Sequence, residues 1–425
     1  MSATSNPSTP AASADSVEPR PVVQRRRGRT GLYAALAVIV VIVIVVAVGA
    51  ATSWYGLQTS STPTKGTVCT TGVTLQGNGA QFVNPLLTAW TSAFATATSN
   101  QVNYVDGGSG TGLTDFSEHP PLIDFAITDD PLTAAEQSAM PGQALTLPFA
   151  GGALTIIYDL PGVAGHLNMT GTVLAGIYNG SITKWNDPAI AAINHGVTLP
   201  GSTIIPVVRS DPAGTTYVLT DFLSQSSAWW NSNIGKGISV DFSKYAPPSE
   251  TAVKGNSLVL STVAKTSYAI GYSDLTDVLT YSTTVQYAGV LNPLGNYVVP
   301  TIANTASAIS DKVASLASIP ASSDTKDWFN VSMVNARGAT DYPLATFVYL
   351  YVYQDTSQGY EPTLTKSQVI VQWLDYILSP GAQAMTGETS PAQLYYTALP
   401  AAVVSVDQTG ISTMTFNGAA IPACT

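Results

Sequence analysis

An arginine stands directly before a short turn of small residues in the run "IIPVVRSDPAGTTYVLTDFL". Arg209 ends a β-prone apolar stretch, and Gly214 and Thr215 begin a stretch with the pattern of a helix. The first N–H groups of a helix have no intrahelical partner and carry partial positive charge, so such a turn can hold an anion. With Arg209 beside it, the turn indicates an oxyanion site. A surface salt bridge between Arg209 and Asp211 is the alternative.

Three further junctions follow the same plan of strand, turn and helix. Their turns are Gly77–Gly79, the run Gly107–Gly112, and a segment that begins at Asp129, with Thr133 marking the next helix start. Glycine lets the backbone approach a ligand closely, and Ser and Thr hydroxyls add neutral donors. One junction of this kind is an ordinary α/β connection. Several of them, together with an isolated arginine, favour an anion site built mostly from neutral donors.

Other kinds of chemistry lack their motifs in this chain. No Gly-Lys-Ser/Thr follows a glycine-rich run, so no Walker loop is present, and no Gly-x-Ser-x-Gly elbow appears. The histidines (His119, His166 and His195) are dispersed, which makes a metal site improbable. We therefore expect no metal, no cofactor and no catalytic residues. The aromatic run at 342–353 is most simply a buried strand.

The elements that must position these turns alternate between strands and helices, which predicts an α/β fold. The 425 residues are enough for two or three lobes. Charged residues make up 10% of the chain, the net charge is −10, and five of the sixteen basic residues lie in the N-terminal tail. Such an acidic body excludes nucleic acid as a partner, because nucleic-acid binding needs clustered Lys and Arg.

The N-terminus predicts a membrane segment. Residues 1–30 form a basic tail that we place in the cytoplasm, and residues 31–52 form an uncharged apolar run of the length that spans a membrane. A signal peptide that is cleaved, leaving a secreted protein, is the alternative. We favour an uncleaved anchor because the run exceeds the usual length of about 7–15 residues for a signal peptide. Residues 53–66 then form a flexible linker to an extracytoplasmic body.

Two cysteines, Cys69 and Cys424, lie at the two ends of this body. A disulfide between them is permitted outside the cell and would tie the two ends of the fold together, whereas two unrelated small residues are the alternative. The sequons at Asn168, Asn179 and Asn330 permit N-glycosylation in a host that glycosylates exported proteins.

The order of the motifs resembles that of the high-affinity phosphate-binding proteins of ABC-type phosphate importers. The resemblance runs from about Gly72 to about Val404 and rests on seven segments: "GNGAQFVNPLLTAW", "VNYVDGGSGTG", "DFAITDDPL", "LAGIYNGSITKWNDPAIAAIN", "VVRSDPAGTTYVLTDFL", "AIGYSD" and "YPLATFVYLYV". Such a series in one order is far more specific than any single motif.

The resemblance implies a set of phosphate contacts. They are Gln81, Phe82, Ser109, Asp129, Arg209, Gly214 and Thr215, with Asp211 bracing Arg209 as an ion pair. Asp129 would accept a hydrogen bond from a protonated phosphate oxygen, which phosphate carries near neutral pH and sulfate does not. The alternative for Asp129 is a role in capping the following helix, which Asp130 could fill equally well.

Two positions depart from the pattern of the family. Gln81 stands where the family has a hydroxyl residue, and its amide could still donate a hydrogen bond over a longer reach. Ala213 stands where the family usually has serine, so a hydroxyl is missing while the backbone N–H remains. These changes bear on affinity and on the exact donor set more than on the class of ligand.

The resemblance also implies the architecture and the partners. We expect a two-lobed periplasmic-binding-protein fold of type II with a hinge, in which residues 67–150 and 343–425 form the first lobe and residues 151–342 the second. Phosphate bound between the lobes would be delivered to a separate permease and its ATPase, with no chemistry on the ligand. The alternatives are a binder of sulfate, arsenate or molybdate, an exported phosphatase with the same anion cradle, and a surface-layer or adhesion protein.

Overall fold

One long strand, β4 (Ala144–Tyr158), joins the two halves of the computed structural model. Up to Ala153 it pairs antiparallel with β12 (Ala345–Tyr353), and from Leu154 onward with β8 (Ala269–Asp274). Every residue of β4 and of β12 is buried, as the apolar sequences of strands covered on both faces require. The buried strand predicted at 342–353 is thereby confirmed.

The main sheet runs in the order β2-β1-β3-β12-β4-β8-β6-β7, and β9 pairs with β4 beside this path. In the first half β1 is parallel to β2 and β3, and in the second half β6 is parallel to β7 and β8. Loops that follow the carboxyl ends of parallel strands meet at one edge of a sheet, where α/β proteins bind their ligands. The remaining strands of this sheet are β1 (Thr74–Gly79), β2 (Gln101–Val105), β3 (Phe125–Thr128), β6 (Ile205–Arg209), β7 (Thr251–Val253) and β9 (Gln286–Tyr287).

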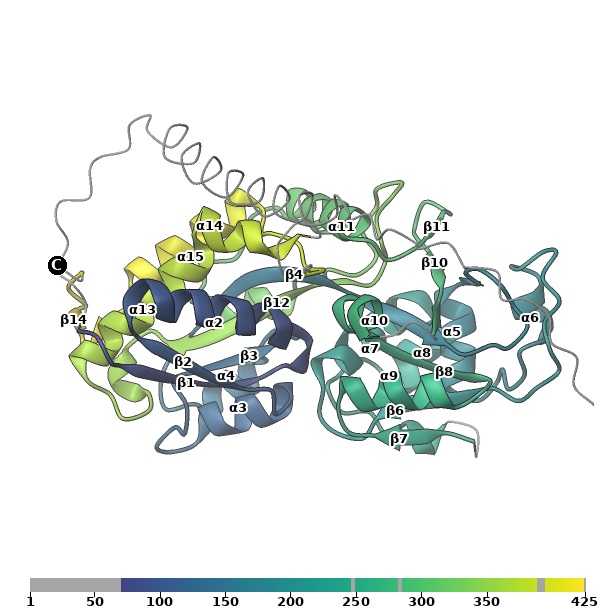
Figure 1. Ribbon diagram of the computed structural model, residues 1–425, viewed down its shortest axis with the longest axis horizontal. Helices are drawn as coiled ribbons and strands as arrows, with labels where there is room; N and C mark the ends of the chain where they lie inside the picture. Colours follow the sequence, from purple (N-terminus) through teal and green to yellow (C-terminus); the bar gives the residue numbers. More distant parts are fainter. Residues whose placement is uncertain (1–69, 246–248, 282–284, 388–393, 424–425) are drawn as a thin grey trace, which may run out of the picture. The chain divides into compact units, whose positions relative to one another are not determined.

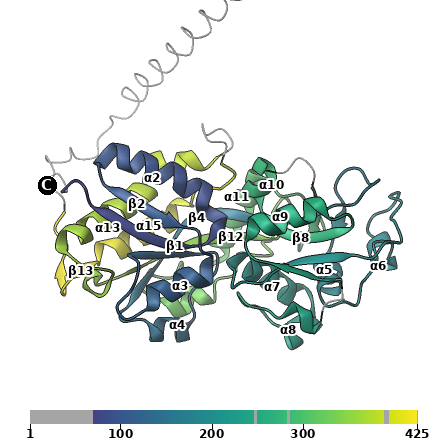
Figure 2. The same ribbon diagram turned by 60° about the horizontal axis from the view of Figure 1, so that its bottom comes forward.

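Helices cover both halves of the sheet, and Figures 1 and 2 show β4 and β12 running between the two halves. The helices packed with the first half are α2 (Asn84–Thr98), α3 (Ser109–Ser117), α4 (Ala134–Ala139), α11 (Ile302–Ser315), α12 (Thr325–Phe329), α13 (Leu364–Leu378), α14 (Pro380–Gln383) and α15 (Ala401–Ser412). Those of the second half are α5 (Gly171–Tyr178), α6 (Pro188–Ala191), α7 (Gly214–Ser226), α8 (Ala228–Asn233), α9 (Asn256–Lys265) and α10 (Leu275–Tyr281).

Short elements complete the fold. A three-stranded sheet has the order β11-β10-β5, and β13 pairs with β14 in a small hairpin. Their bounds are β5 (Asn168–Met169), β10 (Gly289–Leu291), β11 (Tyr297–Val298), β13 (Thr415–Phe416) and β14 (Ala419–Ala420), and the 3-10 helices are η1 (Gln81–Val83), η2 (Phe242–Lys244), η3 (Thr356–Gln358) and η4 (Ala384–Thr386).

The buried side chains form separate hydrophobic cores, which define two lobes. The first lobe packs β1–β3, the first part of β4 and β12 with their helices, and the second packs the end of β4 with β6 and β8. Along β4 the side chain of Ala150 belongs to the first core and that of Ala153 to the second. The α/β fold with two lobes that the sequence predicts is therefore present.

The packing departs from the predicted division of the chain in one region. Ala308 and Ile309 of α11 and Trp328 of α12 lie in the core of the first lobe, although the predicted boundary assigns residues 151–342 to the second. The cause is that α11 and α12 bury their apolar side chains against β4 and β12, which carry the first core. The predicted limits of the lobes stay a prediction, with α11 and α12 as its weak point.

The structure describes residues 70–245, 249–281, 285–387 and 394–423, all of which belong to one compact unit of the chain. The predicted basic tail, membrane segment and linker, together with Cys69 and Cys424, lie outside these residues. Within the described ranges no helix combines the length and the apolar character needed to cross a membrane.

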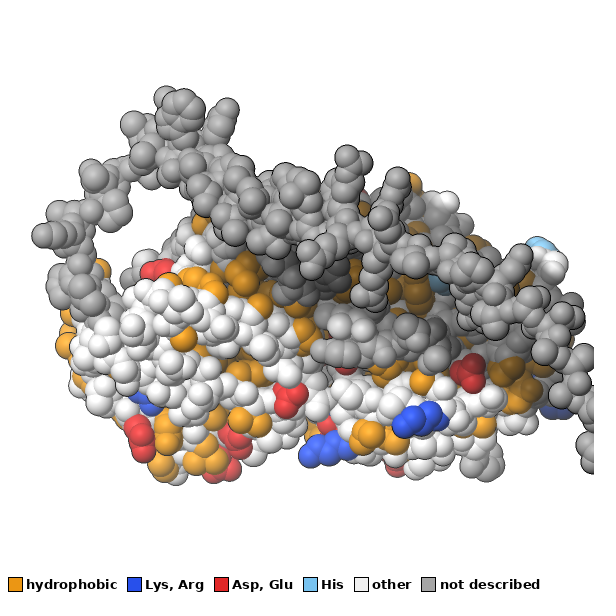
Figure 3. Space-filling view, in the orientation of Figure 1, with side chains coloured by type: hydrophobic (Ala, Val, Ile, Leu, Met, Phe, Trp, Pro, Cys, Tyr) orange, Lys and Arg blue, Asp and Glu red, His pale blue; other side chains and the backbone are white. Residues whose placement is uncertain are grey.

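The surface of the body carries few charges. On the face drawn in Figure 3, Lys, Arg, Asp and Glu side chains are scattered singly among uncharged and hydrophobic ones. Among the described residues visible on this face there is no broad basic patch of the kind that attracts polyanions.

Candidate functional site

The predicted site residues follow the carboxyl ends of parallel strands. Gln81 comes after β1, Ser109 after β2 and Asp129 after β3, whereas Arg209 ends β6. The first three belong to the first lobe and Arg209 to the second, so any site that they form lies where the lobes meet.

Arg209 is buried, with 6% of its surface exposed, and its side chain is held within the second lobe. Its Nε and Nη2 donate to the two carboxylate oxygens of Asp211 at 2.8 and 2.6 Å, a bidentate pair with strong geometry. Its Nη1 donates to Thr215 Oγ1 at 3.2 Å and to Asn256 Oδ1. The alternative of an ordinary surface salt bridge does not describe this residue, because the guanidinium is buried and each of its three nitrogens donates to a partner.

Asp211 braces Arg209 as the resemblance implies. Burial raises the pKa of Asp211, but the hydrogen bonds and the charge of Arg209 outweigh it and leave the pKa below its ordinary value. The backbone N–H of Gly255 donates to the same carboxylate at 3.2 Å. Asp211 therefore stays ionised, and it fixes the plane of the guanidinium.

Asp129 is buried in the first lobe, and its Oδ1 has no hydrogen-bond partner among the described residues. Burial raises the pKa of Asp129 to about 7, although the positive charge of Arg209 acts in the opposite direction. The backbone of Gly214 lies against this side chain, since a Cβ on residue 214 would be 2.6 Å from Asp129 Oδ2. Glycine is thus required where the second lobe meets the carboxyl group of Asp129.

The helix after β3 settles the alternative role of Asp129. Thr133 caps α4: its side chain accepts from the N–H of Glu136 at 3.1 Å, and Glu136 accepts from the N–H of Thr133 at 2.7 Å. This capping box makes Asp129 and Asp130 unnecessary for starting the helix. Asp129 is consequently a buried carboxyl group that capping does not explain.

Helix α3 begins inside the glycine run, at Ser109, rather than after it as the sequence suggests. Gly112 lets the helix touch β1, because a Cβ there would lie 2.6 Å from the carbonyl oxygen of Asn78. Ser109 is 1% exposed, and its Oγ accepts a hydrogen bond from the N–H of Gly214 at 3.2 Å. This bond joins the first lobe to the start of α7 in the second.

The start of α7 brings the remaining predicted residues of the second lobe together. Gly214 and Thr215 are its first two residues, and both are buried. Ala213 occupies the N-cap position and has no side-chain cap, which follows from its missing hydroxyl. Its N–H donates to the carbonyl of Ile238 at 2.9 Å, so this N–H is engaged inside the second lobe.

Gln81 and Phe82 differ in what they contact. The Oε1 of Gln81 accepts from the N–H of Asn256, in the second lobe, at 2.9 Å. Phe82 is buried against Gly152, and its carbonyl oxygen accepts from the hydroxyl of Tyr396 at 2.6 Å. Of the two, Gln81 reaches the other lobe, whereas the side chain of Phe82 packs inside the first.

Asn256 and Asp274 belong to the hydrogen-bond network around Arg209, and the sequence did not point to either of them. Asn256 is 1% exposed; its Oδ1 accepts from Arg209 Nη1 and from Thr215 Oγ1 at 3.3 Å, and its Nδ2 donates to Asp274 Oδ2 at 3.1 Å. Burial, followed by the charge of Asp277, raises the pKa of Asp274 well above its ordinary value. The run "TAVKGNSLVL" is a further junction of strand, glycine and helix, which could have revealed Asn256.

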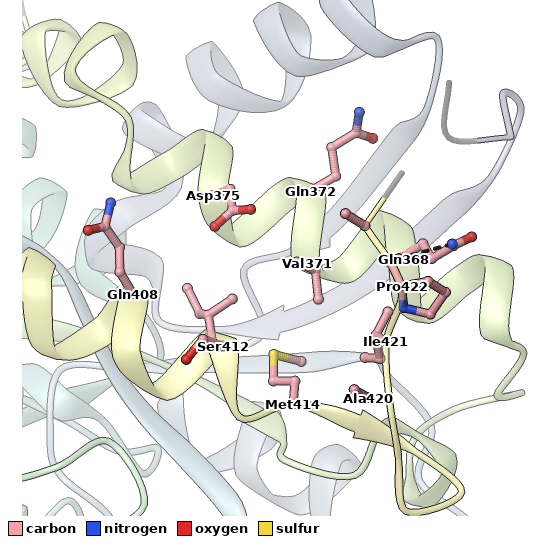
Figure 4. A pocket seen from close by; sticks show the side chains of 12 residues that line it. Gln368, Val371, Gln372, Asp375, Gln408, Ser412, Met414, Ala420, Ile421 and Pro422 are labelled. Carbon is pink, nitrogen blue, oxygen red and sulfur yellow. Dashed lines mark hydrogen bonds between the residues drawn. The ribbon is translucent and has the colours of Figure 1, made fainter. Parts of the chain in front are cut away.

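A groove elsewhere on the first lobe is a poor site for an anion. It has a volume of about 440 Å³ and lies between α13, α15 and the segment after β14 (Figure 4). Its lining includes Asp375 together with amide and apolar side chains, and no Lys or Arg. None of the predicted site residues lines this groove.

The groups at the lobe boundary are of the kinds that bind oxyanions. They combine a fixed guanidinium, a helix start and a hydroxyl with one carboxyl group that can accept a proton-bearing oxygen. Within the part of the chain that the structure describes, no three His, Cys, Asp or Glu side chains are placed to hold a metal ion.

Comparison with known proteins gives both the fold and the family. The family model of the PBP superfamily domain matches residues 57–380. The phosphate-binding protein PstS of Pasteurella multocida is 32% identical over 334 residues, which are 78% of this chain and 88% of the relative, and PstS of Xylella fastidiosa (strain 9a5c) is 34% identical over 292 residues, 68% and 74% of the two chains.

Solved structures show the same fold at lower identity. A phosphate-binding protein from Stenotrophomonas maltophilia superposes with a TM-score of 0.63 at 18% identity, covering 82% of this chain and 96% of that one. The high-affinity periplasmic phosphate-binding protein PfluDING, bound with phosphate, gives 0.61 at 21% identity, covering 82% and 100%. The chain therefore belongs to the PBP superfamily and, within it, to the PstS family of phosphate-binding proteins.

Proposed function

We propose that this protein binds inorganic phosphate between its two lobes and delivers it to the permease of an ABC importer. The observation that carries the proposal is the meeting, at Gly214, of a buried carboxyl group from one lobe with a buried guanidinium network from the other. Membership of the PstS family supports the same ligand. The ligand is carried unchanged, so the protein acts as a binder and not as an enzyme.

Each proposed contact has a distinct task. Arg209 supplies the positive charge, and the start of α7 at Gly214 and Thr215 supplies backbone donors. Ser109 adds a hydroxyl, and Gln81 and Phe82 border the anion from the loop after β1. Asp211 and Ala213 support these groups without touching the ligand.

Asp129 sets the selectivity for phosphate. A carboxylate accepts a hydrogen bond only from an oxyanion that keeps a proton, as phosphate does near neutral pH and sulfate does not. A buried acceptor or donor left unpaired costs about 1–3 kcal/mol, so a fully deprotonated anion is rejected.

The location follows from the N-terminal sequence. We infer that residues 31–52 anchor the protein in the membrane with the body on the extracytoplasmic side, and that the permease and its ATPase are separate chains. The lobes are residues 67–150 with 343–425, and 151–342, except that α11 and α12 pack with the first lobe.

Calorimetry with the purified protein tests the proposal. We expect phosphate to bind most tightly of phosphate, sulfate and molybdate, and arsenate, which keeps a proton as phosphate does, to follow it. Tighter binding of sulfate at neutral pH would contradict the role of Asp129. Hydrolysis of a chromogenic phosphate monoester that is lost on Arg209→Ala would instead identify an enzyme.

A further inference from the structure

The side chain of Gln81 reaches across the boundary between the lobes. Gln81 lies in η1 of the first lobe, and its Oε1 accepts from the N–H of Asn256, the first residue of α9 in the second lobe, at 2.9 Å. The first N–H groups of a helix lack intrahelical acceptors and attract negative partial charge. Because a backbone N–H can only donate, it also fixes the amide of Gln81 with its oxygen towards α9.

The backbone before Asn256 is shaped to admit this contact. Gly255 has a φ of +90°, a conformation that residues other than glycine rarely adopt. A Cβ on residue 255 would lie 3.0 Å from Gln81 Oε1 and 3.1 Å from its Nε2. Glycine therefore allows the amide of Gln81 to lie directly against the start of α9.

Asn256, which Gln81 contacts, belongs to a hydrogen-bond network that includes the guanidinium of Arg209. Asn256 is buried, and its side chain bonds to Arg209, to Thr215 and, at 3.1 Å, to Asp274. The partner that Gln81 finds in the second lobe is thus already fixed by that lobe.

We propose that Gln81 is a latch that holds the lobes together without help from the anion. The latch would slow the release of phosphate, because a ligand leaves a closed site more slowly. This consequence rests on the proposed function. A shorter hydroxyl side chain at this position lacks the reach of a glutamine amide. The latch raises the fraction of ligand-free molecules that are already closed. Less of the binding free energy of the anion is then spent on closing the lobes.

The expected size of the effect is that of one neutral hydrogen bond. Such a bond corresponds to about a two- to tenfold change in an equilibrium constant. The ratio of closed to open protein should change by this factor when the acceptor is removed. Two other hydrogen bonds between the lobes remain in such a variant: the N–H of Gly110 donates to the carbonyl of Pro212 at 3.4 Å, and the N–H of Gly214 donates to the side-chain Oγ of Ser109.

Amide hydrogen exchange in phosphate-free full-length protein tests the latch. Gln81→Leu keeps the size of the side chain and removes the acceptor, Gln81→Glu keeps an acceptor, and Gln408→Leu on the exposed side of α15 is the control. We read the exchange at Gly110, whose N–H bonds to the other lobe away from Gln81. A purely local role of Gln81 would change exchange at Asn256 and leave Gly110 untouched.

We expect exchange at Gly110 to become about two- to tenfold faster in Gln81→Leu and to stay within twofold of wild type in the other two variants. Unchanged exchange at Gly110 in Gln81→Leu would overturn the latch. The measurement contains no phosphate, so it judges the latch alone. Failure of the wild-type protein to bind phosphate in calorimetry would overturn the proposed function and leave the exchange result standing.

Discussion

The two sides of the site are built in different ways. In the second lobe, the hydrogen bonds of the Arg209 side chain end on Asp211, Thr215 and Asn256 of the same lobe. In the first lobe, the side chains of Ser109 and Gln81 bond to the opposite lobe. The side chain of Arg209 in the second lobe finds all of its hydrogen-bond partners within that lobe. The side chains of Ser109 and Gln81 in the first lobe find theirs only where the lobes meet.

This difference separates two properties of a binding protein. A guanidinium held by its own lobe offers the anion a fixed charge before the lobes close, so the second lobe should supply most of the affinity. The first lobe offers neutral groups and a buried carboxyl group, which meet the ligand when the lobes close. These groups should supply the selectivity and should make the release of the ligand slow. Changes on the two sides should therefore have different effects.

The largest effect is expected on the second lobe, from Arg209→Ala. Hydrogen bonds to a charged group are worth about 1.5–3 kcal/mol each, so losing the guanidinium should weaken phosphate binding by about 100-fold or more. Arg209→Lys keeps a charge but loses the planar fork that Asp211 and Asn256 hold, and should give an intermediate loss. Calorimetry measures both.

Arg337→Ala serves as the matched control, because Arg337 is exposed. Its phosphate affinity should equal that of wild type. If Arg209→Ala retained wild-type affinity while its thermal unfolding showed a folded protein, the second lobe would not be the source of affinity.

The two carboxyl groups that interact with the charge of Arg209, one from each lobe, differ in how acid affects them. Burial raises the pKa of Asp129 to about 7, whereas the hydrogen bonds and the charge of Arg209 outweigh burial at Asp211 and leave its pKa below the ordinary value. Burial also raises the pKa of Asp124, directly before β3, to about 6, and that of Asp274 in the second lobe, so both act in the same direction as Asp129. Between pH 4 and 7 the folded protein therefore binds more protons at Asp129 and Asp124 than the unfolded chain does. The free energy of unfolding of the phosphate-free protein should rise as the pH falls through this window.

The expected rise is about 1 kcal/mol per pH unit at Asp129 alone, and denaturant unfolding at pH 7, 6 and 5 measures it. Asp129→Asn should make the dependence shallower. Below about pH 4 the contribution of Asp211 is lost as its carboxylate gains a proton, so stability should stop rising. Stability that falls steadily from pH 7 to pH 5 would contradict the raised pKa of the first-lobe carboxyl groups.

A smaller effect on affinity, but a specific one on selectivity, is expected from Asp129→Asn. An asparagine amide can donate to a fully deprotonated oxygen, so sulfate should gain and phosphate should lose, and the preference for phosphate should fall by about tenfold. Asp327→Asn on the exposed surface of α12 is the control. An unchanged ratio of the two affinities would place selectivity outside the first lobe.

Much of the fold could be predicted from local patterns. The alternation of strands and helices, the buried strand at 342–353 and the turns after β1, β2 and β6 are all visible in the sequence, because apolar runs and glycine turns are local features. The packing of α11 and α12 on the first lobe could not be predicted in this way. It depends on which sheet face a helix covers, and no local pattern encodes that choice.

The site shows the same limit. The sequence identified Arg209, Asp211 and Ser109 as candidates, and the structure places them at the boundary between the lobes. It could not reveal that Asn256 bonds to Arg209, since 47 residues separate the two in the chain. Nor could it show that Gln81 contacts α9, because a contact between lobes is fixed by tertiary structure alone.

The smallest effect is expected from Ser109→Ala, which removes the acceptor that Gly214 N–H finds in the first lobe. Losing one neutral hydrogen bond of about 1 kcal/mol, whether this bond or the one that the hydroxyl donates to the anion, should weaken phosphate binding about fivefold. Because this bond joins the lobes, the loss should appear as faster release, with an unchanged rate of association. Ser117→Ala on the same helix is the control, since Ser117 Oγ bonds to the carbonyl of Leu113 in its own helix at 2.7 Å. A slower association in stopped-flow measurements of Ser109→Ala would mean that Ser109 meets the anion before the lobes close. The first lobe would then contribute to the initial binding as the second lobe does, and the contrast between the two lobes would fail.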